Sequence, residues 1–120
     1  METKVKRLPD PIYLSGPMSY YEDNNVAAFA EACFQLRQQG FVVNSPHEIE
    51  TVGLDHIKEA EELWRYFMRQ DIYLIVRSKS FVMLPGWECS RGARLEVAIA
   101  HALGMPVVPY HLLASPKANA

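Results

Sequence analysis

The chain has 120 residues, a length that predicts one compact domain over residues 1–120 without a separate substrate or regulatory module. Hydrophobic residues make up 49% and charged residues 22% of the sequence, which excludes a disordered or low-complexity protein. Twelve basic and fourteen acidic residues give a formal net charge of -2. This balance excludes the broad basic surface of a protein that binds polymeric nucleic acid, and it favours small-molecule or protein partners.

The cysteines, histidines and apolar runs exclude several further classes of protein. Two cysteines and four histidines lack the spacing of a metal site or a disulfide framework. The apolar runs are too short for a membrane span, and the charged start of the chain leads into Pro9-Asp10-Pro11 instead of a signal-peptide core. We therefore expect a cytoplasmic protein with reduced cysteines, no metal and no membrane attachment.

The first half of the chain alternates between strand and helix patterns. Residues 12–15 form a short apolar run closed by Gly16-Pro17, the pattern of a buried strand. Apolar residues at three- and four-residue spacing predict a helix over 25–39, ended by Gly40, and residues 41–43 form a second short strand. Residues 47–56 have no clear period, which predicts a loop with one helical turn and a candidate mobile lid.

The second half repeats the alternation. We expect a long helix over 57–75, a strand over 81–84, a helix that runs from the N-cap Ser90 to about 103, and a last strand at 107–108. The tail over 112–120 is rich in Ala, Ser, Pro and Asn and is expected to be disordered or extended.

Strands that alternate with helices predict parallel pairing through right-handed crossovers. The expected fold is α/β, a flavodoxin-like or Rossmann-like three-layer sandwich with a central parallel sheet of about 4–5 strands. Ligands bind such sheets beyond the carboxyl ends of the strands. The sequence therefore predicts that the chemistry gathers at residues 15–18, 44–46 and 85–90.

Two carboxylates occupy positions where the helix patterns place apolar residues. Asp71 lies within the apolar stripe of the long helix, and Glu96 shares a face with Ala93, Ala100 and Leu103. Burying an ionised carboxylate is costly, so both positions require a partner or a function. Two convergent carboxylates are what cleavage of a glycosidic bond needs. The structural alternative is pairing with nearby arginines: Arg65 or Arg69 for Asp71, and Arg91 or Arg94 for Glu96.

The segment before the last predicted helix has features of an anion site. Ser90 at the N-cap and Gly92 in the first turn would leave backbone N–H groups free at the positive end of the helix dipole. Trp87 is either a platform for a base or a partial core plug. Tyr13 is most simply a core aromatic whose hydroxyl needs a partner, which a nearby carboxylate would supply.

The motifs together resemble the nucleoside 2-deoxyribosyltransferase-like superfamily over residues 12–110, and most closely its small, often phage-encoded, uncharacterised DUF4406-like group. The segments that carry the resemblance are Tyr13–Met18, Asn25 with Ala28-Phe29, Arg69–Asp71 and Leu84–Glu96. Characterised members of the superfamily are nucleoside deoxyribosyltransferases and 2'-deoxynucleoside 5'-monophosphate N-glycosidases. They share a flavodoxin-like fold and break the bond between the base and C1' of the sugar.

The resemblance implies roles for individual residues. Glu96 matches the nucleophile that attacks C1', Asp71 matches the residue that handles protons or orients the sugar, and Tyr13 matches the residue that hydrogen-bonds the nucleophile. Ser90 and Gly92 match the segment that holds a 5'-phosphate. The remaining residues implied in substrate binding are Ser15, Gly16, Pro17, Met18, Asn25, Gly86 and Trp87.

The resemblance also implies a homodimer or larger assembly in which a neighbouring copy lends a C-terminal polar residue, for which Ser115 and Asn119 are candidates. Relatives often carry Asp where this chain reads Ser78-Lys79-Ser80. The expected activity is hydrolysis of a 2'-deoxynucleoside 5'-monophosphate to base and deoxyribose 5-phosphate, without a cofactor. Base exchange between nucleosides is the alternative enzyme, and a catalytically idle nucleotide sensor or adaptor is the alternative without chemistry. The base itself is left open.

Overall fold

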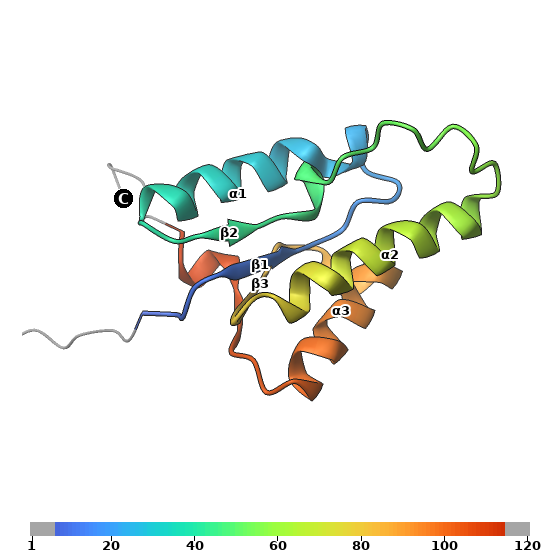
Figure 1. Cartoon of the computed structure of the whole chain (residues 1–120). Coiled ribbons are helices and arrows are strands. Elements are labelled where there is room, and N and C mark those ends of the chain that lie inside the picture. Colours follow the sequence, from blue (N-terminus) through green and yellow to red (C-terminus); the bar gives the residue numbers. More distant parts are fainter. Residues whose placement is uncertain (1–6, 115–120) are drawn as a thin grey trace, which may run out of the picture.

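Four short parallel strands form the central layer of the molecule, in the order β2-β1-β3-β4 (Figure 1). The structure is a computed structural model and describes residues 7–114. The strands are β1 (Ile12–Ser15), β2 (Val43–Asn44), β3 (Ser80–Met83) and β4 (Val107–Pro109). The predicted α/β sandwich with a parallel sheet of about 4–5 strands is therefore confirmed.

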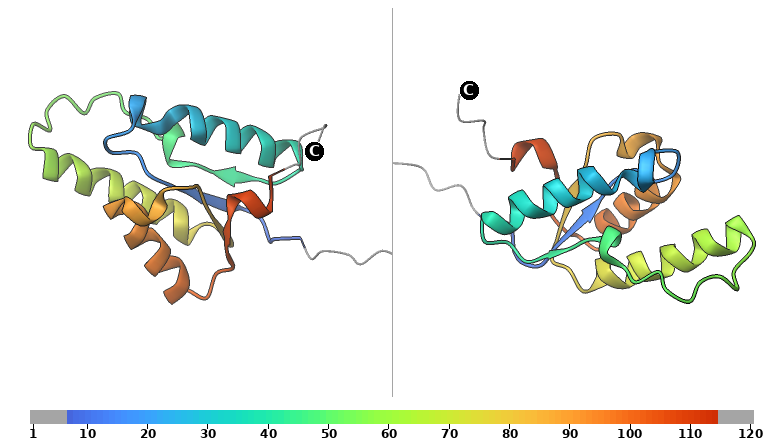
Figure 2. Two further views of the ribbon diagram at one scale, coloured as in Figure 1. Left: turned by 180° about the vertical axis from the view of Figure 1, so that it is seen from behind. Right: turned by 90° about the horizontal axis from the view of Figure 1, so that it is seen from above.

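Helices cover both faces of the sheet (Figures 1 and 2). Helix α1 (Val26–Gln38) lies on one face, while α2 (Ala60–Val76) and α3 (Arg91–Ala102) lie on the other. Successive residues of a strand point to opposite faces, so Ile12 and Leu14 join the core beneath α1. Tyr13 joins the second core, beneath α2 and α3.

Short 3-10 turns connect these elements: η1 (Glu22–Asn25), η2 (Pro46–Glu48), η3 (Trp87–Cys89) and η4 (Tyr110–Leu112). The single turn η2 and the loop that follows it confirm the loop with one helical turn that was predicted for residues 47–56. None of the helices in residues 7–114 is long and apolar enough to cross a membrane.

The starts of β2 and α2 lie two or more residues from the sequence prediction. The strand predicted at 41–43 pairs only from Val43, because the amide of Val42 is bound by the Asp10 carboxylate at 3.0 Å. The long helix begins at Ala60, because Ile57 closes a turn onto the Leu54 carbonyl.

The first residues of the predicted tail are part of the fold. Residues Tyr110–Leu112 form η4 and Leu113 packs against the core beneath α1, so the extended tail expected from 112 is wrong at its start. Residues 115–120 lie outside the described part of the chain.

The carboxyl ends of β1 and β3 meet where the strand order reverses, since β2 continues the sheet on one side of β1 and β3 on the other. A methyl group added at Gly16 would lie 2.8 Å from Cβ of Leu84, closer than packed carbon atoms approach. The amide of Leu84 also donates to the Ser15 carbonyl at 2.8 Å. Glycine at position 16 is thus what allows the two strand ends to lie together.

Candidate active site

Asp71 of α2 and Glu96 of α3 are both turned into the protein, as their places in the apolar patterns predict. Their side chains are 7% and 4% exposed. The alternative of arginine partners is wrong: Arg91 and Arg65 both pair with Glu61, at 2.8 and 3.6 Å. No ion pair within residues 7–114 includes either buried carboxylate.

Glu96 contacts a hydroxyl of β1. The Ser15 hydroxyl donates to Oε1 of Glu96 at 2.7 Å, and both groups are buried. The Tyr13 hydroxyl lies near Glu96 but outside hydrogen-bonding geometry. In the described chain, this hydroxyl and Oδ1 of Asp71 are the buried side-chain atoms without a hydrogen-bond partner. Buried polar atoms without partners are uncommon in folded proteins and mark a place where a ligand or water completes the structure.

The environment favours protons on these groups. Burial raises the pKa of Glu96 well above its ordinary range and the charge of Asp71 raises it further, whereas the Ser15 and Tyr13 hydroxyls lower it. Burial also raises the pKa of Asp71, and its contact with Glu96 acts in the opposite direction. Both carboxyls therefore hold a proton to higher pH than a free carboxyl does, which lets one act as an acid while the other acts as a nucleophile or base.

Two loops at the strand ends close against each other. Gly86 has φ +89, and a Cβ there would lie 2.6 Å from the Tyr21 hydroxyl and 3.2 Å from the Pro17 ring. The Asn25 amide donates to the Pro17 carbonyl at 2.9 Å, and Met18 packs against the core beneath α1. Tyr21 was not predicted from the sequence, and its only signal was an aromatic residue shortly after the Gly-Pro turn.

The start of α3 matches its prediction. The Ser90 hydroxyl accepts from the Ala93 amide at 3.1 Å, which is the expected N-cap contact. A Cβ on Gly92 would lie 3.3 Å from Sδ of Met68, so the small residue also lets α3 approach α2 closely.

Arg91 adds a cation beside this helix start. Its guanidinium group stacks 3.6 Å from the ring centre of Trp64 and donates to both oxygens of Glu61, at 2.9 and 2.8 Å. Because Glu61 and Arg91 lie 30 residues apart, the sequence pattern did not predict the contact.

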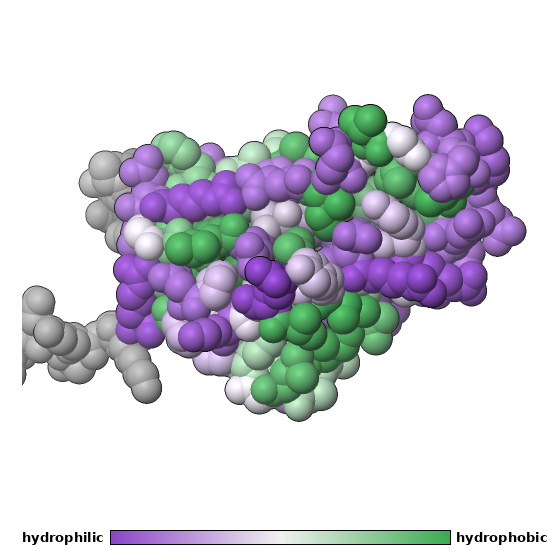
Figure 3. All heavy atoms as spheres, viewed as in Figure 1, coloured by the Kyte–Doolittle hydropathy of each residue, from purple (hydrophilic) through white to green (hydrophobic). Residues whose placement is uncertain are grey.

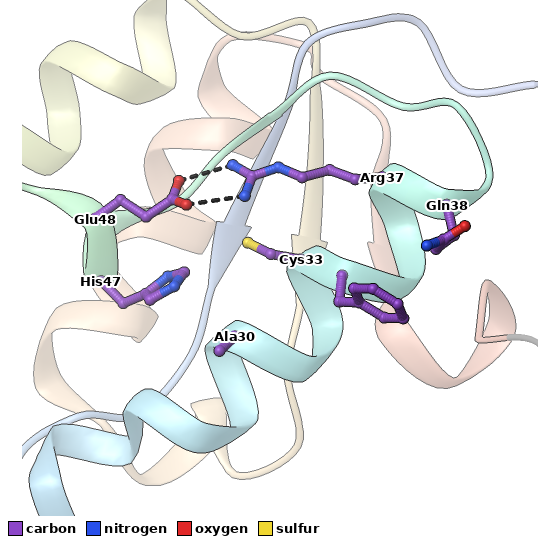
Figure 4. A pocket seen from close by; sticks show the side chains of 7 residues that line it. Ala30, Cys33, Arg37, Gln38, His47 and Glu48 are labelled. Atoms are coloured by element: carbon purple, nitrogen blue, oxygen red, sulfur yellow. Dashed lines mark hydrogen bonds and ion pairs between the residues drawn. The ribbon is translucent and has the colours of Figure 1, made fainter.

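Two cavities lie away from the two carboxylates. One of about 420 Å³ lies between α1 and η2 (Figure 4). Its charges are already paired, because Arg37 donates to both oxygens of Glu48 at 2.8 and 2.7 Å and the ring of His47 bonds Ser45. The cavity is lined by Ala30, Cys33, Phe34, Arg37, Gln38, His47 and Glu48.

A second cavity of about 230 Å³ opens beyond β3 and β4 and is lined in part by Trp87 and Tyr110. Trp87 packs against the core beneath α2 and α3, which agrees with a partial core plug. In the part of the chain that the structure describes, no group of three His, Cys, Asp or Glu side chains could hold a metal ion. The candidate site is therefore the cluster of Tyr13, Ser15, Asp71 and Glu96.

The comparisons with known proteins agree with this fold. A family model described as a domain of unknown function, DUF4406, matches residues 10–109. A solved structure of a 2-deoxyribosyltransferase from the psychrotolerant bacterium Bacillus psychrosaccharolyticus, described as a biocatalyst for the synthesis of antiviral and antitumoral nucleosides, is similar with a TM-score of 0.64. It is 24% identical, over 82% of this chain and 69% of that one. No curated protein matches the chain. The chain thus has the Rossmann-like fold of that transferase.

Proposed function

The chain belongs to the DUF4406 family, and we propose that it is an N-glycosidase that hydrolyses 2'-deoxynucleoside 5'-monophosphates. The observation that carries the proposal is the pair of buried carboxylates, Asp71 and Glu96, without a cation partner among residues 7–114. Ser15, which contacts Glu96, is the last residue of β1, so the pair lies at the sheet edge where α/β proteins bind ligands.

Two carboxylates suffice for the reaction. In the proposed mechanism a carboxylate oxygen of Glu96 forms a bond to C1' while the bond from C1' to the base nitrogen breaks and its electron pair leaves with the base. Asp71 delivers the proton that the leaving base requires. Water then hydrolyses the sugar ester, with the proton of the water returned to Asp71, and releases deoxyribose 5-phosphate.

The start of α3 supports a substrate with a 5'-phosphate. The first amides of α3, including that of Gly92, stand at the positive end of a 12-residue helix. The guanidinium group of Arg91 adds a positive charge at the start of α3. Its ion pair with Glu61 lies at the surface, and surface ion pairs contribute little to stability. A phosphate dianion can compete with Glu61 for this group.

Base exchange between nucleosides is the second candidate, and the fold of a 2-deoxyribosyltransferase favours it. The two activities share the sugar ester on Glu96 and differ in whether water or a second base resolves it. An idle nucleotide sensor would not need both buried acids, which lower the stability of the fold while they are ionised.

The proposed assembly is a homodimer or larger. The outward faces of α2 and α3 leave large apolar side chains exposed, and Figure 3 shows hydrophobic residues gathered over α3. They are Tyr73, Val76, Leu95 and Leu103. We propose that a second copy covers this face and lends a polar residue to the site. Ser115 and Asn119, the candidates for that residue, lie outside the described residues. The proposed compartment is the cytoplasm, in keeping with the free cysteines Cys33 and Cys89.

The test is an assay of free base with a panel of deoxynucleoside monophosphates and the matching nucleosides, each with and without a second base. The proposal predicts release of base from monophosphates, a much lower rate for nucleosides, and no new nucleoside when a second base is present. Formation of a new nucleoside without any gain from the 5'-phosphate would establish base exchange instead. Tight binding of a nucleotide, measured by calorimetry, with no turnover would establish the sensor.

A further inference from the structure

The contact between Ser15 and Glu96 gives Ser15 a role other than substrate binding. We propose that Ser15 is a positioning residue, whose hydroxyl holds the Glu96 carboxyl group in one orientation and favours its ionised form for attack on C1'. The role at C1' rests on the proposed function, whereas the hold on the charge of Glu96 is a property of the folded protein.

The geometry leaves little room for the hydroxyl of Ser15 to reach a substrate. Its residue is 0% exposed, and the hydroxyl already donates to Oε1 of Glu96 at 2.7 Å across 81 residues of sequence. An O–H donor at this distance from a carboxylate is a strong, charge-assisted hydrogen bond. In the proposed reaction the other oxygen of Glu96, Oε2, forms the bond to C1'.

The backbone of Ser15 is fixed before any substrate arrives. Ser15 pairs with Met83 in the register of β1 and β3, and its carbonyl accepts from the Leu84 amide at 2.8 Å. The neighbouring Gly16 lies against Leu84, so the end of β1 cannot shift easily. A donor on a paired, buried strand orients its acceptor more exactly than a donor on a loop.

The groups around Glu96 disfavour a negative charge on it, so its ionised form depends on hydrogen-bond donors such as Ser15. The titratable groups that act on Glu96 are Asp71 from α2, which disfavours a second negative charge, and Tyr13 from β1. In the described residues no cation faces Glu96. Ser15 is thus the side chain in hydrogen-bonding geometry that stabilises the carboxylate form of Glu96. Without its hydroxyl, Tyr13 would be the main group that still lowers the pKa of Glu96 against the effects of burial and Asp71.

The chain offers a matched control at Ser80. Ser80 is also 0% exposed and lies on the neighbouring strand β3, but its hydroxyl donates to the Pro9 carbonyl at 2.7 Å, away from Glu96. Ser80→Ala therefore removes an equally buried hydroxyl without touching the carboxylates. Ser15→Thr retains the hydroxyl group. Ser15→Cys retains the size of the side chain but has a weaker hydrogen-bond donor. If one Ser15 variant fails to fold, another can still be measured.

The first measurement follows the ionisation of Glu96 directly, by carbon NMR of labelled glutamate carboxyl groups over a pH titration. We expect the midpoint for Glu96 to move to higher pH in Ser15→Ala and Ser15→Cys, to stay near wild type in Ser15→Thr, and to be unchanged in Ser80→Ala. An unchanged midpoint in Ser15→Ala would overturn the inference, whatever reaction the protein catalyses.

The second measurement is the pH profile of kcat/KM for release of base. A hydrogen bond to a charged group predicts a loss of about tenfold or more for Ser15→Ala on the acid side of the profile, and a smaller loss as the pH rises. Equal losses at every pH would mean that Ser15 is only structural. If the wild type releases no base, the proposed function fails, and the NMR titration still decides whether Ser15 holds Glu96 ionised.

Discussion

Glu96 is the residue at which function and stability conflict. Burial and Asp71 raise its pKa, so between about pH 4 and the raised value the folded protein binds more protons than the unfolded chain. The free energy of unfolding therefore falls as the pH rises through this window, and the destabilisation is complete above the raised pKa. A carboxylate kept under these conditions supports the proposal that Glu96 takes part in a reaction.

Replacement of the Glu96 carboxyl group with an amide tests whether its buried charge destabilises the fold. Glu96→Gln keeps an acceptor for Ser15 and removes the buried charge, so we expect a gain of about 1–3 kcal/mol in the free energy of unfolding near pH 8 and almost none near pH 4. Denaturant unfolding at both pH values measures the difference. Glu61→Gln is the control, since Arg91 lowers the pKa of that exposed residue and no gain is expected. An equal loss of stability at both pH values in Glu96→Gln would contradict the account.

Tyr13 gives a second prediction at this scale. Its buried hydroxyl has no hydrogen-bond partner in the described chain, so Tyr13→Phe should change the free energy of unfolding by less than about 1 kcal/mol. The same hydroxyl lowers the pKa of Glu96, so the acid limb of kcat/KM should move to higher pH. A large loss of stability with an unchanged pH profile would assign Tyr13 to packing alone.

At the scale of elements, local patterns predicted most of the fold. The apolar run of β1, the periodicity of α1 and the Ser90 cap of α3 each lie within one segment, and the structure agrees with all three. The late start of β2 depends on the Asp10 carboxylate, 32 residues away, which no local pattern contains. The inward carboxylates were predictable as breaks in an apolar stripe, whereas the contact from Ser15 to Glu96 spans 81 residues and depends on packing.

The close approach of β1 and β3 is testable at this scale. Gly16→Ala would place a methyl group 2.8 Å from Cβ of Leu84, and we expect a loss of about 1–3 kcal/mol in stability because backbone must move. Gly92→Ala is the matched control. Its methyl group would meet the flexible end of Met68 at 3.3 Å and Nε1 of Trp64 at an ordinary contact distance of 3.7 Å, and alanine favours the helix. Thermal unfolding that shows equal losses for both variants would contradict the role of Gly16.

At the scale of the whole molecule, apolar side chains on one side of the sheet are only partly covered. The pattern of α2 predicts a broad apolar stripe, yet Met68, Asp71 and Ile75 are its buried residues. Leu95 of α3 and Leu103, which directly follows α3, are 42% and 53% exposed on the same side of the sheet. Apolar faces of this kind mark association between proteins.

We therefore expect a dimer or larger particle for the wild type in light scattering coupled to size-exclusion chromatography. The double variant Leu95→Lys with Leu103→Lys should shift the protein to a monomer. Phe34→Lys, at an equally exposed apolar residue of α1, should leave the assembly unchanged. A monomeric wild type at micromolar concentration would contradict the proposed assembly.

The central claim is that Glu96 breaks the bond between a base and the deoxyribose of a nucleotide. The most direct measurement is the rate of base release from deoxynucleoside monophosphates by the wild type and by Glu96→Gln, with nucleotide binding followed by calorimetry. The account predicts turnover by the wild type, and for Glu96→Gln a loss of turnover of at least about a thousandfold with binding largely retained. Equal turnover by the two proteins, or no release of base from any deoxynucleotide by the wild type, would contradict it.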